Sequence, residues 1–171
     1  NLLGRIDIGE IMLENKTGRY EVGNVVITSH STDDHYTTRL NSRFADAIYN
    51  GSASFVDFLK DLQMITIGNE LPALYKNDSH TWKGNEYDID FTCHDVQNVL
   101  AFAAPGLYIE NGTSIKADID RKGHLKAEMA SGRIAYKRNY MKGVNMFFDN
   151  SDDALNGRLT CAEISASSIG M

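Results

Sequence analysis

The densest group of potential metal ligands is the segment His30-Ser31-Thr32-Asp33-Asp34-His35, which holds two imidazoles and two carboxylates. Side chains of these types bind divalent transition metals. The segment lies between two stretches of alternating apolar residues, one that ends near Ser29 and one that begins at Tyr36. Because connections between strands normally run over the surface, we expect a solvated hairpin loop here and no metal site.

A pair of carboxylates, Asp88 and Asp90, shares one face of a predicted strand at a separation of about 7 Å. Similar separations occur between the catalytic carboxylates of glycosidases, but alternating charges are also ordinary on the outward face of a strand. The chain contains no GxGxxG, GxSxG, HExxH or complete P-loop sequence. We therefore predict no catalytic residue and no cofactor, and a glycan hydrolase is the last of three functional hypotheses.

The two cysteines, Cys93 and Cys161, have no spacing typical of zinc ligands. Both fall among alternating apolar positions, where a buried free thiol behaves as a small apolar side chain. We predict free thiols, with a disulfide in an oxidising compartment as the alternative.

The charge of the chain argues against nucleic acid as a partner. Acidic residues outnumber basic ones by 23 to 17, which gives a net charge of −6, whereas binding to phosphate backbones needs a concentrated positive surface. Residues 116–142 are the exception, with eight basic and three acidic side chains. A solvated sheet face explains this segment, and contact with lipid headgroups or another anionic partner is the alternative.

Alternation of apolar and polar residues is the main structural signal. It is clearest in Tyr87, Ile89, Phe91 and Cys93, whose intervening residues are polar, and such alternation is typical of a half-buried strand. The same pattern recurs in residues 115–119 and 125–129, on either side of a turn at 121–123. Further strands are predicted within 5–9, 19–29, 36–49, 133–137, 144–148 and 158–164. These elements predict a mainly β fold, an antiparallel meander curled into an elongated trough, a sandwich or a barrel.

Two segments have helical spacing of their apolar residues instead. Residues 55–62 follow Ser54, which together with Asp57 resembles a capping box. A second helix is predicted to begin at Asp95 and to stop before Pro105-Gly106. Pro72 and Pro105 lie 33 residues apart and both open a Pro-x-Leu-Tyr string. We therefore expect residues 1–171 to form one repetitive β domain.

The chain looks like a piece of a longer protein. It begins at Asn1, and its first residues lack the basic and apolar regions of a signal peptide. The longest uncharged stretch, 96–109, is shorter than the roughly 20 residues that cross a bilayer. We expect any signal or anchor to lie elsewhere in the parent protein.

Several strings resemble a known family. They are Leu40-Asn41-Ser42-Arg43-Phe44-Ala45-Asp46-Ala47-Ile48-Tyr49-Asn50-Gly51, the predicted helix that follows, Leu71-Pro72-Ala73-Leu74, and the later stretch 102–119. Together they resemble the TamB family of translocation and assembly module proteins in the AsmA-like superfamily, in the versions found in Bacteroidetes. The likeness extends from about residue 4 to residue 164.

This resemblance implies a non-enzymatic periplasmic segment of a protein anchored in the inner membrane. Members of the family form a long U-shaped β trough (a β-taco), with an apolar concave face. They are linked to phospholipid transport between membranes, to outer-membrane protein assembly and secretion, and to a TamA-like barrel partner in the outer membrane. We therefore expect phospholipid and outer-membrane proteins as partners.

An open trough would leave an apolar surface large enough to bind ligands. The predicted lipid-binding residues that line it are Tyr87, Ile89, Phe91, Ile115, Ile119, Leu125, Met129, Ile134, Val144, Met146 and Phe148. The alternative is that the same residues fill a closed core and that free strand edges pair with outer-membrane proteins. Alternation alone does not distinguish the two.

Overall fold

The computed structural model describes residues 3–65, 81–151 and 156–166. The string at Leu71–Leu74, with Pro72, lies outside the described residues, so the predicted repeat is seen only in its second half. The elements of the first part of the chain are β1 (Gly4–Asn15), β2 (Gly18–Thr32), β3 (His35–Ser42), β4 (Ala45–Gly51) and α1 (Phe55–Gln63). The second part contains β5 (Tyr87–Cys93), α2 (Gln97–Ala103), β6 (Leu107–Ile109), β7 (Ser114–Ile119), β8 (Leu125–Tyr136), β9 (Asn139–Asp149), β10 (Asn156–Thr160) and β11 (Glu163–Ser165).

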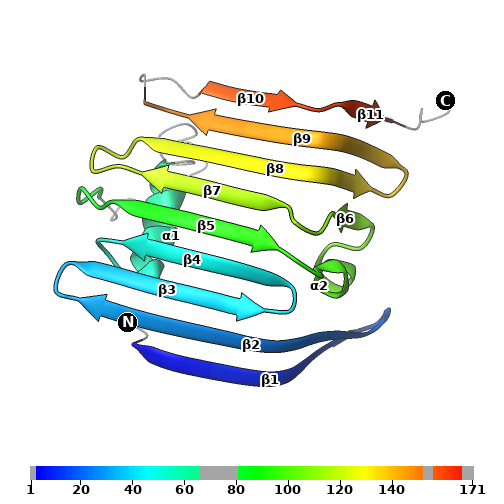
Figure 1. Cartoon of the computed structure of the whole chain (residues 1–171), viewed down its shortest axis with the longest axis horizontal. Coiled ribbons are helices and arrows are strands. Elements are labelled where there is room, and N and C mark those ends of the chain that lie inside the picture. The colour runs from blue at the N-terminus through cyan, green and yellow to red at the C-terminus, as the bar shows by residue number, and fades with distance from the viewer. Residues whose placement is uncertain (1–2, 66–80, 152–155, 167–171) are drawn as a thin grey trace.

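The strands form one antiparallel sheet of eleven strands, in the order β1-β2-β3-β4-β5-β7-β8-β9-β10 (Figure 1). The short strand β6 pairs with β8, and β11 pairs with β9. The sheet does not close on itself, since β1 and β10 are its edges. The prediction of a mainly β antiparallel meander with two short helices is confirmed.

Several strand boundaries differ from the sequence prediction, and β1 and β9 are longer than the predicted 5–9 and 144–148. The predicted strand 36–49 is two strands, because the chain reverses at Arg43-Phe44. Ser42 stabilises this turn: its Oγ accepts a hydrogen bond from the Ala45 amide at 2.9 Å and donates one to the Ala45 carbonyl at 2.7 Å. Conversely, β8 combines two predicted strands, 125–129 and 133–137. The predicted strand 158–164 is divided into β10 and β11.

Helix α1 begins as predicted, with Ser54 as its N-cap. The Ser54 Oγ accepts a hydrogen bond from the Asp57 amide at 3.2 Å and donates one to the Asp57 carboxylate at 2.7 Å, which lowers the pKa of Asp57. The prediction for α2 is wrong at its start, because Val96, not Asp95, is the N-cap. The Asp95 carboxylate instead lies 3.1 Å from the Arg43 guanidinium.

The main core lies between α1 and the adjoining end of the sheet. Phe58 of α1 and Ile65, which follows the helix, pack against side chains from four strands. The strand residues are Tyr49, Tyr87, Ile119 and Leu125. Asp61 of α1 is fully buried in this core and accepts hydrogen bonds from the Tyr87 hydroxyl and from Asn85 Nδ2. The polar contact fixes α1 over one end of the sheet, because a buried carboxylate is costly unless it is hydrogen-bonded.

Candidate functional site

One line of side chains crosses the sheet from edge to edge and is apolar at every position. Directly paired residues of neighbouring strands point to the same face, so the strand register alone defines this line. We call it the apolar row, and it consists of Ile6, Ile27, Leu40, Ala47, Phe91, Ile115, Met129, Met146 and Leu159. It contains one residue from each of nine strands.

None of the nine residues of the apolar row is buried. Ile6 and Ile115 are each 37% exposed and Leu159 is 51% exposed. The next line of residues on the opposite face is mainly polar, and there Asp90 and Lys116 lie 3.5 Å apart. The sheet therefore has a polar face and an apolar face, and the middle of the apolar face is open to solvent.

Helix α1 covers the apolar face at one end. Tyr87, Ile119 and Leu125 are paired across β5, β7 and β8, and they are 2%, 1% and 7% exposed. Burial beneath the helix raises the pKa of Tyr87, as does the neighbouring Asp61 carboxylate. Of the residues predicted to line a groove, these three belong to a closed core.

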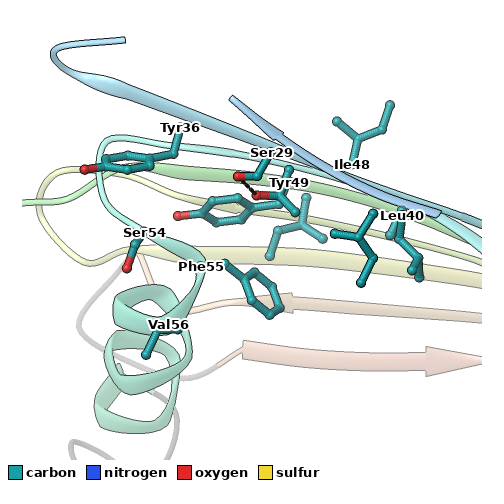
Figure 2. A pocket seen from close by; sticks show the side chains of 12 residues that line it. Ser29, Tyr36, Leu40, Ile48, Tyr49, Ser54, Phe55 and Val56 are labelled. Atoms are coloured by element: carbon teal, nitrogen blue, oxygen red, sulfur yellow. Dashed lines mark hydrogen bonds between the residues drawn. The ribbon is translucent and has the colours of Figure 1, made fainter. Parts of the chain in front are cut away.

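A pocket of about 350 Å³ lies where α1 meets the apolar row. Ligand sites of small molecules are commonly of this size or larger. Figure 2 shows Phe55 extending from α1 toward the sheet, and its ring centre lies 5.4 Å from that of Tyr49. The sheet contributes Ile27, Tyr36, Leu40, Ala47 and Ile89 to the lining. The hydroxyls among the described lining residues are those of Ser29, Thr38, Ser54 and the tyrosines. The pocket is therefore an apolar recess continuous with the apolar row.

The other eight residues predicted to line the groove fall into three groups. Ile89, Phe91, Ile115, Met129, Met146 and Phe148 lie together on the open part of the apolar face. Val144 is on the same face but is only 1% exposed. Ile134 is five residues from Met129 along β8, so its side chain points to the opposite face of the sheet. There it is paired with Met141 and Ile109 and belongs to a separate apolar group.

The part of the apolar face formed by β2, β3 and α1 was not predicted from the sequence. Ile27 and Leu40 are in the apolar row, and Phe55 and Val56 line the pocket. Ile27 was hidden within the run Val25-Val26-Ile27, where both faces of the strand are apolar. The detectable signal was the number of apolar residues in α1, which is more than one helix face can bury; Phe55 and Val56 are 45% and 59% exposed.

The polar candidates lie in an exposed turn or have structural partners. Segment 30–35 is exposed and contains the turn between β2 and β3, and among the described residues no group of three His, Cys, Asp or Glu side chains is placed to hold a metal. Asp88 accepts a hydrogen bond from Asn50, and Asp90 is paired with Lys116. These carboxylates therefore have structural partners on the polar face.

Both cysteines are free thiols. Cys93 is buried at the end of β5, and burial raises the pKa of its thiol. A raised thiol pKa lowers the thiolate fraction, so Cys93 is a poor nucleophile. Its neighbour His94 is hydrogen-bonded to Asp46 at 2.9 Å, which lowers the pKa of that carboxyl.

Comparison of the chain with protein-family models, with curated proteins and with solved structures finds no match. Across the described residues neither helix has the length and apolar content that crossing a bilayer requires.

Proposed function

We propose that this chain is a non-enzymatic, lipid-contacting segment of a TamB-like protein of the cell envelope, and that its apolar row binds phospholipid acyl chains. The single observation that carries the proposal is the nine-residue apolar row, none of whose members is buried. Monomeric soluble proteins rarely leave a continuous apolar surface of this extent uncovered. An inner-membrane anchor, a periplasmic location and a TamA-like barrel partner belong to the same proposal.

The dimensions of the row suit an acyl chain. Nine strands about 4.8 Å apart give a row about 38 Å long. The hydrocarbon core of a bilayer is about 30 Å thick and contains two leaflets, so one acyl chain extends about 15 Å. Each methylene that leaves water contributes about 0.8 kcal/mol, and the row offers contact along the whole chain.

Beside the apolar row, residues of α1 form one side of the pocket. Phe55 and Val56 face the same space as Leu40 and Ala47, so a chain lying on this part of the row would be covered from two sides. Among the described residues that line the pocket, none is charged. Binding there would select for apolar chains without selecting a headgroup.

The experiment is gentle native mass spectrometry of the chain purified from bacteria, followed by lipid extraction. We expect co-purifying phospholipid that is lost in Phe91→Asp, which places a charge in the middle of the apolar row. The matched control is Phe147→Asp, because Phe147 of β9 is paired with Glu128 and Arg158 on the polar face. A lipid-free parent chain, or equal loss in both variants while both remain folded, would contradict the proposal.

A second candidate function is a scaffold whose free edge pairs with strands of outer-membrane proteins. The observation that favours it is β1, a 12-residue edge strand that is mostly exposed and pairs only with β2. An edge strand offers unpaired backbone groups to another chain. The register between β1 and β2 shifts beside Glu10. Regular strand pairing along β1 is therefore restricted to the segments before and after this irregularity.

A proline in this edge separates the two candidates. Asp7→Pro removes a backbone N–H from β1 and leaves the middle of the apolar row intact. The scaffold hypothesis expects weaker binding to an unfolded outer-membrane protein with unchanged lipid content. Unchanged protein binding would exclude the β1 edge as the docking strand.

A further inference from the structure

The turn between β8 and β9 gathers basic and aromatic side chains. Lys137 and Arg138 form the two-residue turn, and Arg133 and Lys142 are directly paired across the two strands. We call this cluster the basic tip, and it consists of Arg133, Lys137, Arg138 and Lys142 with Tyr108, Tyr136 and Tyr140. It lies at the end of the sheet where β6 pairs with β8 (Figure 1).

The basic and aromatic groups of the tip are in contact. The Arg133 guanidinium carbon lies 5.6 Å from the ring centre of Tyr108 and 5.0 Å from that of Tyr140. Lys137 Nζ lies 5.2 Å from the Tyr136 ring centre. Tyr108 and Tyr136 are nevertheless 38% and 51% exposed. The tip therefore presents rings and cations together to the solvent.

The backbone of the tip is fixed. Lys137 has a φ of 55°, a conformation that few residues other than glycine adopt. Its amide donates a hydrogen bond of 2.8 Å to the Gly106 carbonyl, in the segment that follows α2. The turn is thus held by a second part of the chain, which reduces the entropy lost when the tip binds a partner.

The positive charge of the tip is only partly neutralised. Lys142 is paired with Glu163 at 2.8 Å, Arg133 also helps to lower the pKa of the Glu163 carboxyl, and the Glu110 carboxylate lies close to Gly132. Within the described residues, Arg133, Lys137 and Arg138 form no ion pair with a carboxylate. The tip therefore has an excess of positive charge in a chain whose net charge is −6.

The turn at Lys137-Arg138 lies at the same end of the antiparallel meander as the turn at Lys16-Thr17 (Figure 1). The turn at Asp33-Asp34 lies at the opposite end, as does the turn that begins at Asp120 and contains Arg121 and Lys122. Both ends therefore carry basic side chains, and the tip is distinguished by the contacts between its cations and its tyrosine rings.

We propose that the basic tip docks onto the anionic phospholipid headgroups of a bilayer surface. Basic side chains near such a surface are attracted to it, and tyrosine rings favour the boundary between water and lipid. The tip combines both on one fixed hairpin. This docking does not require that the apolar row hold an acyl chain, so it can be tested separately.

The experiment is co-sedimentation of the chain with vesicles of phosphatidylcholine, with and without about a quarter of phosphatidylglycerol. We expect binding only to the anionic vesicles and its loss at about 0.5 M salt, where the Debye length is about half its physiological value. The double variant Lys137→Gln and Arg138→Gln removes two charges, so the partition coefficient should fall roughly 30-fold. Emission from a Tyr136→Trp variant should shift to the blue with anionic vesicles only.

The matched control is Arg121→Gln with Lys122→Gln, which removes a basic pair from the β7–β8 turn at the opposite end of the sheet. It should bind anionic vesicles as the parent chain does. A parent chain that does not bind them, or equal loss in both double variants, would overturn the proposal. Binding to a polyglutamate peptide without binding to vesicles would also overturn it, in favour of an acidic protein partner.

Discussion

Tyr87 of β5 donates its hydroxyl hydrogen to the carboxylate of Asp61 in α1, and both side chains are buried. Asn85 donates a second hydrogen bond to the same carboxylate oxygen at 2.9 Å. The contact joins the helix to the sheet within an otherwise apolar core. It therefore fixes α1 over the end of the apolar face that the helix covers.

Tyr87→Phe should destabilise the fold. The change removes a donor and leaves part of the hydrogen-bonding capacity of the buried Asp61 carboxylate unmet, which costs about 1–3 kcal/mol. Urea unfolding followed by circular dichroism measures the free energy. The control is Tyr136→Phe, because Tyr136 is 51% exposed and its change should cost less than about 0.5 kcal/mol. Equal costs would mean that the hydroxyl of Tyr87 contributes nothing specific.

The same core should make the protein sensitive to alkali. Burial raises the pKa of Tyr49 and of Tyr87 above the ordinary tyrosine value near 10, and nearby carboxylates add to both shifts. Their contribution to stability is complete below pH 10 and is lost as pH rises toward the folded-state pKa. The reason is that the unfolded chain releases phenolic protons that the folded chain retains.

Each buried tyrosine adds up to about 1.4 kcal/mol per pH unit to this loss. Urea unfolding at about pH 8, 10 and 11 measures the slope. Tyr87→Phe should remove roughly half of it, while Tyr136→Phe should leave it unchanged. A slope that is the same in all three proteins would show that the buried phenol of Tyr87 is not its source.

Gly51 should not tolerate a side chain. A Cβ at this position would lie 2.6 Å from Tyr49 Oη and 2.6 Å from Tyr87 Cδ1, and both rings are held in the core under α1. We expect Gly51→Ala to cost about 2 kcal/mol or more through overpacking. Gly157→Ala in β10 is the control, since its nearest neighbour would be Phe148 at 3.7 Å. Thermal unfolding of the two variants compares them directly.

Local signals in the sequence predicted most of the elements. Alternation identified β5 and the direction of its side chains, and Ser54 with Asp57 located the start of α1. The turn at Arg43-Phe44 was missed because it contains none of the glycine, proline or asparagine residues that usually indicate turns. It depends instead on the two hydrogen bonds between Ser42 and Ala45.

The candidate site could be predicted only in part, for a physical reason. A period of two tells which face of a strand a residue occupies, but not what packs upon that face. Ile115 and Ile119 belong to one strand and one face, yet they are 37% and 1% exposed. The difference arises from α1, whose position depends on contacts between residues far apart in the sequence, such as Asp61 with Tyr87.

These two isoleucines provide the last prediction. Ile119→Asp would bury a charge in the core, and we expect it to cost more than about 4 kcal/mol and to prevent folding. Ile115→Asp places the same charge on the open part of the apolar row, where water reaches it, and should cost about 1 kcal/mol. Urea unfolding measures both free energies. If Ile115→Asp were as damaging as Ile119→Asp, the apolar row would be covered in solution, and a sealed core would replace the acyl-chain site as the explanation for its composition.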